Sequence, residues 1–225
     1  MPLIGITGGV ATGKSTVTRW LQAHLGEGAR VFSSDEAARE ILDNDADALA
    51  ALRAEFGDAV FHPETGVVRR ETLRELVFAN TAHRRALEAI LHPRIRARWT
   101  NWARSELQKD PQSALLVEIP LLYETGAEAL LDRVVTVACS PATQWRRLLE
   151  TRRLPAAVAR GVLDSQLDLL EKIRRCDHLI WNDDLPPSSA VLAGLEVQIA
   201  LCARGLQSAF GLPTPTPAAA AADLR

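Results

Sequence analysis

The sequence predicts an α/β protein built on a parallel five-stranded sheet flanked by helices. Short apolar, β-branched segments alternate with stretches of helical periodicity, which favours parallel strands joined by right-handed helical crossovers. The helical stretch between the second strand and Ala114 is too long for one crossover, so part of it is expected to form a separate lobe. The length of 225 residues suits one main domain with such an addition.

The elements are assigned in order along the chain. Apolar, β-branched runs predict strands at residues 3–7, 29–33, 114–119, 133–138 and 178–181. Helical periodicity fills residues 14–25 and then 35–102, where Gly57, His62-Pro63 and Asn80 interrupt it.

The last third of the chain continues the alternation. Ser140 followed by Pro141 is a helix-start signal for a basic stretch that ends at Arg153. Further helices are expected at residues 158–174 and 189–204. The tail, residues 211–225, is rich in proline and alanine and has too little to bury, so it is expected to be disordered.

Composition and charge exclude several classes of function. A formal net charge of −2 gives no overall electrostatic reason to bind nucleic acid or a membrane surface. The three cysteines are widely separated and fit neither a disulfide framework nor a zinc site. No run of roughly 20 apolar residues could form a membrane helix, and the first residues do not resemble a signal peptide. We expect a cytoplasmic protein that binds neither nucleic acid nor membranes; its oligomeric state is not indicated.

A glycine-rich loop joins the first predicted strand to the first predicted helix. Residues 8–15, GGVATGKS, match the pattern G-x-x-x-x-G-K-[ST] in full. Glycines let backbone N–H groups surround phosphate oxygens, and the positive end of the following helix adds to the attraction. Lys14 is expected to reach the β- and γ-phosphates of ATP, and the Ser15 hydroxyl to ligate Mg²⁺. The alternative is a glycine-rich turn that contains a lysine by chance.

Two carboxylates are candidates for the chemistry. Asp35 follows the second strand and opens a helix, where it could accept the proton of an attacking hydroxyl. The alternative is an acidic residue that stands in the first turn only because the helix dipole stabilises it there. Glu118 follows the apolar residues 114–117 of the third strand and could hold Mg²⁺ through water, or pair with a nearby arginine. Arg147 lies in a basic stretch. This stretch is either a lid whose arginine neutralises the charge of the transferred phosphate, or a solvated helix face.

Several motifs in register resemble the dephospho-CoA kinase family over about residues 3–185. They are Thr7-Gly8-Gly9 with Gly13-Lys14-Ser15-Thr16, Asp35 after the second strand, Arg69-Arg70, Phe78-Ala79-Asn80, Leu91-His92-Pro93, Pro120-Leu121-Leu122-Tyr123-Glu124, Ser140-Pro141-x-Thr143-Gln144-x-x-Arg147, Gln166, Lys172 and Asn182. A GTPase of this length should carry an N-K-x-D motif, and none is present.

The resemblance implies a P-loop kinase that transfers the ATP γ-phosphate to the ribose 3′-hydroxyl of dephospho-CoA. It implies a nucleotide-binding core (1–44, 112–139 and 175–205), a helical CoA-binding lobe (45–111) and a helical lid (140–174). The residues expected to bind ATP are Gly8, Gly9, Val10, Ala11, Thr12, Gly13, Lys14, Ser15, Thr16 and Asn182. The catalytic residues are expected to be Lys14, Asp35 and Arg147, with Asp35, His92 and Leu121 at the substrate and Ser15 and Glu118 at Mg²⁺.

The chain departs from the family pattern mainly in the predicted lid. Thr151 and Gly161 stand where the family usually has arginine, while arginines occupy positions 152 and 160. The proline that usually follows the lid glutamine is absent, and Leu167-Asp168 stands in its place. Ala11 replaces a common glycine, which is tolerable if its backbone is not left-handed. Two other hypotheses stay open: a kinase of the same fold with a nucleoside or nucleotide acceptor, and a weakened relative that binds nucleotide or CoA as a sensor.

Overall fold

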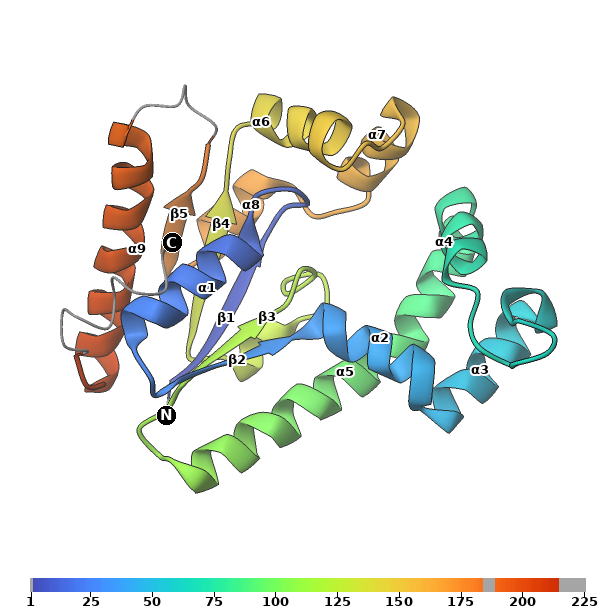
Figure 1. Cartoon of the computed structure of the whole chain (residues 1–225), viewed down its shortest axis with the longest axis horizontal. Coiled ribbons are helices and arrows are strands. Elements are labelled where there is room, and N and C mark those ends of the chain that lie inside the picture. Colours follow the sequence, from blue (N-terminus) through green and yellow to red (C-terminus); the bar gives the residue numbers. More distant parts are fainter. Residues whose placement is uncertain (1, 184–188, 215–225) are drawn as a thin grey trace. The chain divides into compact units, whose positions relative to one another are not determined.

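The structure is a computed structural model that describes residues 2–183 and 189–214, with the side chains of 189–193 left out. Its centre is a five-stranded sheet whose paired strands all run parallel (Figure 1). The strands, in the order β2-β3-β1-β4-β5, are β1 (Leu3–Gly8), β2 (Ala29–Ser33), β3 (Ala114–Glu118), β4 (Arg133–Ala138) and β5 (His178–Trp181). The predicted sheet is confirmed, and only the ends of β1 and β3 differ by a residue.

Helices occupy most of the remaining described chain. They are α1 (Lys14–Leu25), α2 (Ser34–Asn44), α3 (Ala46–Phe56), α4 (Arg70–Ala79), α5 (Thr81–Lys109), α6 (Pro141–Arg146), α7 (Ala156–Asp164), α8 (Leu169–Arg175) and α9 (Ser189–Phe210). Short 3-10 turns lie at η1 (Asp58–Val60) and η2 (Ala127–Leu130), and a π-helical turn forms η3 (Arg147–Thr151). None of the described helices is long and apolar enough to cross a membrane.

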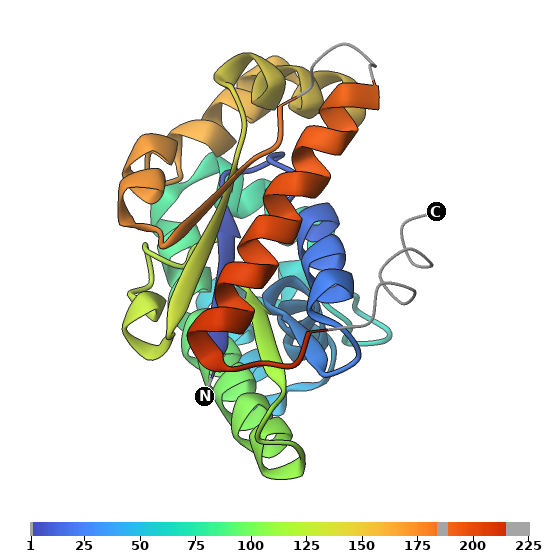
Figure 2. The ribbon, with the colours of Figure 1, turned by 90° about the vertical axis from the view of Figure 1, so that its left-hand side faces the viewer.

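Helices α1 and α9 cover one face of the sheet, side by side (Figure 2). Val17 and Leu21 of α1 and Ile199 and Leu206 of α9 are fully buried in one cluster with strand residues such as Val135. Because strand side chains alternate between the two faces, Thr136 points to the opposite face. There its hydroxyl donates to the Lys172 carbonyl of α8 at 3.5 Å.

The chain divides into two compact units. The sheet unit comprises Met1–Ser33 and Trp102–Arg225, and the helical unit comprises Ser34–Asn101. The helical unit has its own apolar cores, one around Leu52, Val60 and Leu73 and one around Ile41 and Leu91. It therefore overlaps the predicted lobe at 45–111 and also takes in α2.

Local features of the sequence explain where several helices begin. The Ser140 side chain accepts a hydrogen bond from the Thr143 N–H at 3.2 Å, and Pro141 is the first residue of α6, as predicted. The stretch 158–174, predicted as continuous, is two helices, because the Asp168 carboxylate accepts from the N–H groups of Leu170 and Glu171 and caps α8.

Three other helical predictions need correction. The basic stretch up to Arg153 is not one α-helix but α6 followed by the π-helical turn η3. Helix α5 continues past Trp102 to Lys109, with Pro93 inside it. Helix α9 runs beyond residue 204 to Phe210, since its apolar face continues through buried Leu206. Of the predicted tail, Leu212 is buried in the sheet unit, and residues 215–225 lie outside the described residues.

Candidate functional site

The glycine-rich loop connects β1 to α1 at the carboxyl end of the sheet. Gly8 ends β1 in a position where a Cβ would lie 2.2 Å from the Val137 carbonyl oxygen, so only glycine fits. Gly13 adopts φ 86° and directly precedes α1. The backbone at these two points is therefore close-packed or left-handed, as a loop that wraps around phosphates requires.

Ala11, between these glycines, also adopts a left-handed conformation. Its φ is 60°, so the condition under which an alanine is tolerated without strain is not met. The Ala11 methyl group is buried against Leu148 and Ala159, and this packing offsets part of the cost of the left-handed backbone.

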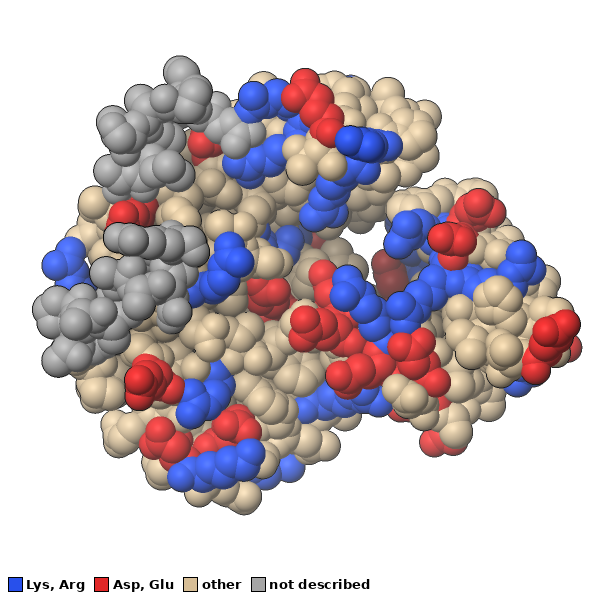
Figure 3. Space-filling view, viewed as in Figure 1, with Lys and Arg blue, Asp and Glu red and all other residues tan. Residues whose placement is uncertain are grey.

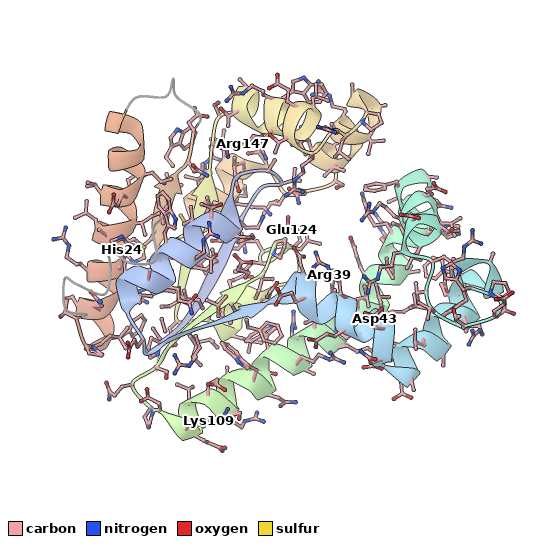
Figure 4. The ribbon with its side chains drawn as sticks, viewed as in Figure 1. His24, Arg39, Asp43, Lys109, Glu124 and Arg147 are labelled. Carbon is pink, nitrogen blue, oxygen red and sulfur yellow. The ribbon has the colours of Figure 1, made fainter. Side chains whose placement is uncertain are left out.

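Four polar side chains hold the loop from outside. The Gln144 Nε2 donates to the Val10 carbonyl and the Val10 N–H donates to Gln166 Oε1, both at 2.8 Å. Arg147 points toward the loop (Figure 4) and its Nη1 donates to the Ala11 carbonyl at 3.1 Å. The Asn182 Nδ2 donates to the Thr12 carbonyl at 2.8 Å. The loop conformation therefore depends on residues that lie 134 to 170 positions further along the chain.

Arg147 joins two parts of this arrangement. Its Nη2 donates to the Asn182 carbonyl at 3.0 Å while Nη1 binds the loop. Asp183, the next residue, accepts from both the N–H and the hydroxyl of Ser140, at 3.2 and 2.8 Å. The turn after β5 thus connects the loop to the start of α6, and it brings the predicted residues Arg147 and Asn182 together.

The first turn of α1 carries the predicted phosphate and metal ligands. Lys14 Nζ donates to the Gly9 carbonyl at 3.3 Å, so the ammonium group lies over the loop. The Ser15 hydroxyl donates to Glu118 Oε2 at 3.5 Å, and Glu118 Oε1 is buried without a hydrogen-bond partner among the described residues. Thr16 follows, exposed. A hydroxyl beside a carboxylate with an unsatisfied oxygen fits Mg²⁺ bound directly or through water.

No described group of three or more histidine, cysteine, aspartate or glutamate side chains could hold a metal by itself.

A buried ion pair lies beside the loop between β3 and η2. Lys172 of α8 has no exposed side-chain surface, and its Nζ lies 2.8 Å from Glu124 Oε1 and 3.2 Å from the Pro120 carbonyl oxygen. Glu124 Oε1 also accepts from the Leu167 N–H at 3.0 Å. The pair therefore fixes the start of α8, and with it Gln166, to the loop that follows β3.

The other predicted substrate residues are distributed over both units. Leu121, half-buried, lies in the loop after β3 of the sheet unit. Asp35 is exposed in the first turn of α2, and His92 is half-buried in α5; both belong to the helical unit. Register places Ser33, two residues before Asp35, opposite Glu118 in the neighbouring strand. Their substrate roles stay predictions.

The helical unit contains a cavity of about 540 Å³. Its lining includes the cationic side chains of Arg69 and Arg70 together with His62. The Arg70 guanidinium pairs with the Asp43 carboxylate at 2.6 Å. Basic and acidic side chains lie next to one another on this unit in Figure 3.

Sequence reasoning missed the loop-binding roles of Gln144 and Gln166 and the burial of Lys172. All three stand in the motifs that carried the family resemblance, and this was the only sign of their importance. Neither glutamine belongs to a charge or glycine pattern, and a lysine in a helical stretch is usually exposed.

Comparisons with known proteins agree on one family. The sequence profile described as dephospho-CoA kinase matches residues 2–186. The dephospho-CoA kinase of Anaeromyxobacter dehalogenans is 40% identical over 191 residues, covering 84% of this chain and 88% of that protein. The dephospho-CoA kinase of Hydrogenovibrio crunogenus is 35% identical over 186 residues, covering 83% and 91%.

Solved structures are similar over almost the whole chain. The dephospho-CoA kinase from Campylobacter jejuni has a TM-score of 0.62 at 25% identity and covers 92% of this chain and 97% of that one. A crystal structure of a Thermus thermophilus protein has a TM-score of 0.67 at 28% identity and covers 89% and 97%.

Proposed function

The chain belongs to the dephospho-CoA kinase family, and we propose that it transfers the γ-phosphate of ATP to the ribose 3′-hydroxyl of dephospho-CoA. The products are coenzyme A and ADP. The observation that carries this proposal is the complete phosphate-binding loop, held by Gln144, Arg147 and Gln166 from the segment after β4. The relatives that match most of the chain are named dephospho-CoA kinases, so an acceptor other than dephospho-CoA, or a sensor without turnover, is not favoured.

The loop binds the phosphates of ATP. Backbone N–H groups of the loop, apart from the Val10 N–H that is bound by Gln166, and the N-terminus of α1 attract the phosphate oxygens. Lys14 turns from the Gly9 carbonyl toward the β- and γ-phosphates and neutralises charge there. Ser15 and Glu118 would hold Mg²⁺, and the ion would neutralise part of the negative charge of the phosphates.

Asp35 orients the acceptor hydroxyl and accepts its proton. The oxygen of the ribose 3′-hydroxyl attacks the γ-phosphorus, the bond to the bridging oxygen of ADP breaks, and the proton passes to the Asp35 carboxylate. Its place two residues after the end of β2, a strand whose last residue lies opposite Glu118, supports this role.

The segment 140–174 acts as the lid. Arg147 compensates the negative charge that develops on the equatorial oxygens during transfer, and the docked helices exclude water that would otherwise take the phosphoryl group. The helical unit binds the acceptor, and the Arg69 guanidinium that lines its cavity suits an anionic group of dephospho-CoA. The enzyme acts in the cytoplasm, in keeping with three cysteines that form no disulfide bond in the described part of the chain.

The test is a direct assay with purified protein, Mg²⁺, ATP and dephospho-CoA. ADP release must depend on the acceptor, and mass spectrometry must show a product heavier by one phosphoryl group. Lys14→Met and Asp35→Asn should each lower turnover by about a thousandfold or more, as expected for groups acting on the transferred phosphoryl group. Lys109→Met, an exposed lysine at the end of α5, is the matched control and should behave as the unmodified protein. ADP release with a nucleoside acceptor but not with dephospho-CoA would refute the proposal.

A further inference from the structure

The π-helical turn η3 changes which side chains share a face of the predicted lid. The Arg152 N–H donates to the Arg147 carbonyl at 2.9 Å, five residues earlier. An α-helix makes this bond over four residues, so the π-turn holds one residue more. Arg152 therefore lies one turn beyond Arg147 on the same face, the position that residue 151 would have in an α-helix.

This face looks toward the phosphate-binding loop. Arg147 donates from it to the Ala11 carbonyl, and Leu148, the next residue, is fully buried against Ala11. Basic side chains gather over α6 and the following turn in Figure 3. The Arg152 side chain is exposed and makes no hydrogen bond or ion pair with any part of the chain that the structure describes.

The turn is fixed at its far end. Arg153 adopts a left-handed conformation, φ 52°, and the Leu154 N–H donates to the Leu148 carbonyl at 3.1 Å. This bond ties the end of the π-helical turn to Leu148, which is buried. The extra residue of the turn is therefore held in place by packing. The second displaced arginine, Arg160, has a partner: its guanidinium lies 4.9 Å from the centre of the Trp145 ring.

We propose that Arg152 is a second cation of the lid, which acts beside Arg147 on the charge that develops on the transferred phosphoryl group. This inference rests on the proposed function. An arginine that is not paired in the protein keeps its five donors for phosphate oxygens, and a place one turn from Arg147 allows both to reach the same group. The π-turn thus compensates for the displacement of arginine from position 151 to position 152.

The test compares two neighbouring arginines. Arg152→Gln removes the proposed cation, while Arg153→Gln removes a charge that is also exposed, from the next position, which the left-handed turn carries away from that face. Single-turnover transfer with saturating ATP and dephospho-CoA should fall about 10- to 100-fold in Arg152→Gln. Arg153→Gln should stay within about twofold of the unmodified protein, and the dissociation constant of ATP should change by less than about threefold in both. Arg152→Lys should restore part of the loss.

A second readout does not depend on turnover. ADP with aluminium fluoride and dephospho-CoA imitates the transferring group, and Arg152→Gln should weaken this complex more than it weakens ADP alone. Equal effects of the two glutamine variants, or a transfer rate unchanged in Arg152→Gln, would overturn the inference. If the unmodified protein shows no acceptor-dependent ADP release, the proposed function itself is wrong, and this outcome is distinct from the other two.

Discussion

Replacing Lys172 by methionine should destabilise the protein far more than removing a surface ion pair of the same length. Lys172 is fully buried, and its ammonium lies 2.8 Å from Glu124 Oε1 and 3.2 Å from the Pro120 carbonyl oxygen. Methionine keeps most of the apolar length of the side chain, so the change removes chiefly the charge and its hydrogen bonds.

The expected loss follows from these contacts. The hydrogen bonds that the Lys172 ammonium donates to Glu124 and to the Pro120 carbonyl both involve a charged group, and such bonds contribute about 1.5–3 kcal/mol each. Removing one partner of a fully buried pair costs about 3–5 kcal/mol, because the other charge is left unpaired. The Glu124 side chain is 21% exposed, so water partly solvates it and the lower part of this range applies. We expect a fall in the free energy of unfolding of about 3–4 kcal/mol.

Urea unfolding followed by circular dichroism measures this difference, with the slope compared between variants so that a change in midpoint reports stability. Lys109→Met is the control: its ammonium lies 2.7 Å from Glu106 Oε1, but the lysine side chain is 66% exposed. That variant should lose no more than about 0.5 kcal/mol. Adding Glu124→Gln to Lys172→Met should recover part of the loss, since the unpaired charge is gone.

A change of less than about 0.5 kcal/mol in Lys172→Met would refute the reasoning, because a buried charge cannot lose its partner at so small a cost. Equal losses in Lys172→Met and Lys109→Met would show that burial is not what makes the pair matter.

Three further changes test other parts of the site. Ala11→Gly should alter the free energy of unfolding by less than about 1 kcal/mol, because relief of the left-handed backbone is offset by the lost methyl packing. Ala11→Val should lower the free energy of unfolding by more than about 2 kcal/mol, because a β-branched residue is strained at this positive φ. A valine variant as stable as the parent in urea unfolding would contradict a positive φ at this position. Gly161 lies in the exposed middle of α7, and no atom lies within 4 Å of the Cβ that an alanine would add. Gly161→Ala should therefore raise the melting temperature in scanning calorimetry by about 2–4 °C. A melting temperature at or below that of the parent would contradict this expectation. Gln166→Glu keeps the acceptor for the Val10 N–H but adds a negative charge beside the loop, so the KM for ATP should rise about tenfold, and an unchanged KM would count against its position near the phosphates.

Much of the fold was predictable because local chemistry and tertiary structure agree. The strands at 29–33, 133–138 and 178–181 and the helix at 14–25 have the predicted bounds, since apolar runs end at turn residues that the tertiary structure also requires. The start of α6 was equally predictable, because the capping bond joins Ser140 to Thr143, only three residues later in the sequence.

The parts that could not be predicted depend on partners distant in the chain. The burial of Lys172 becomes clear only when Glu124, 48 residues earlier, is placed beside it. The left-handed backbone of Ala11 is set by loop closure and by packing on Leu148, and no local preference of alanine indicates it. Helical periodicity also cannot separate an α-turn from the π-turn at η3, since both present arginines and leucines at similar intervals.

The bonds that Gln144, Arg147 and Gln166 make to Val10 and Ala11 couple two equilibria. Each bond forms only when the phosphate-binding loop has this shape and the segment after β4 lies against it. A ligand that selects this loop shape must therefore shift the population toward the docked segment, and the docked segment must raise affinity for that ligand by the same factor. Substitutions remote from ATP, at Gln144 or Gln166, would then change nucleotide affinity through the population of closed molecules.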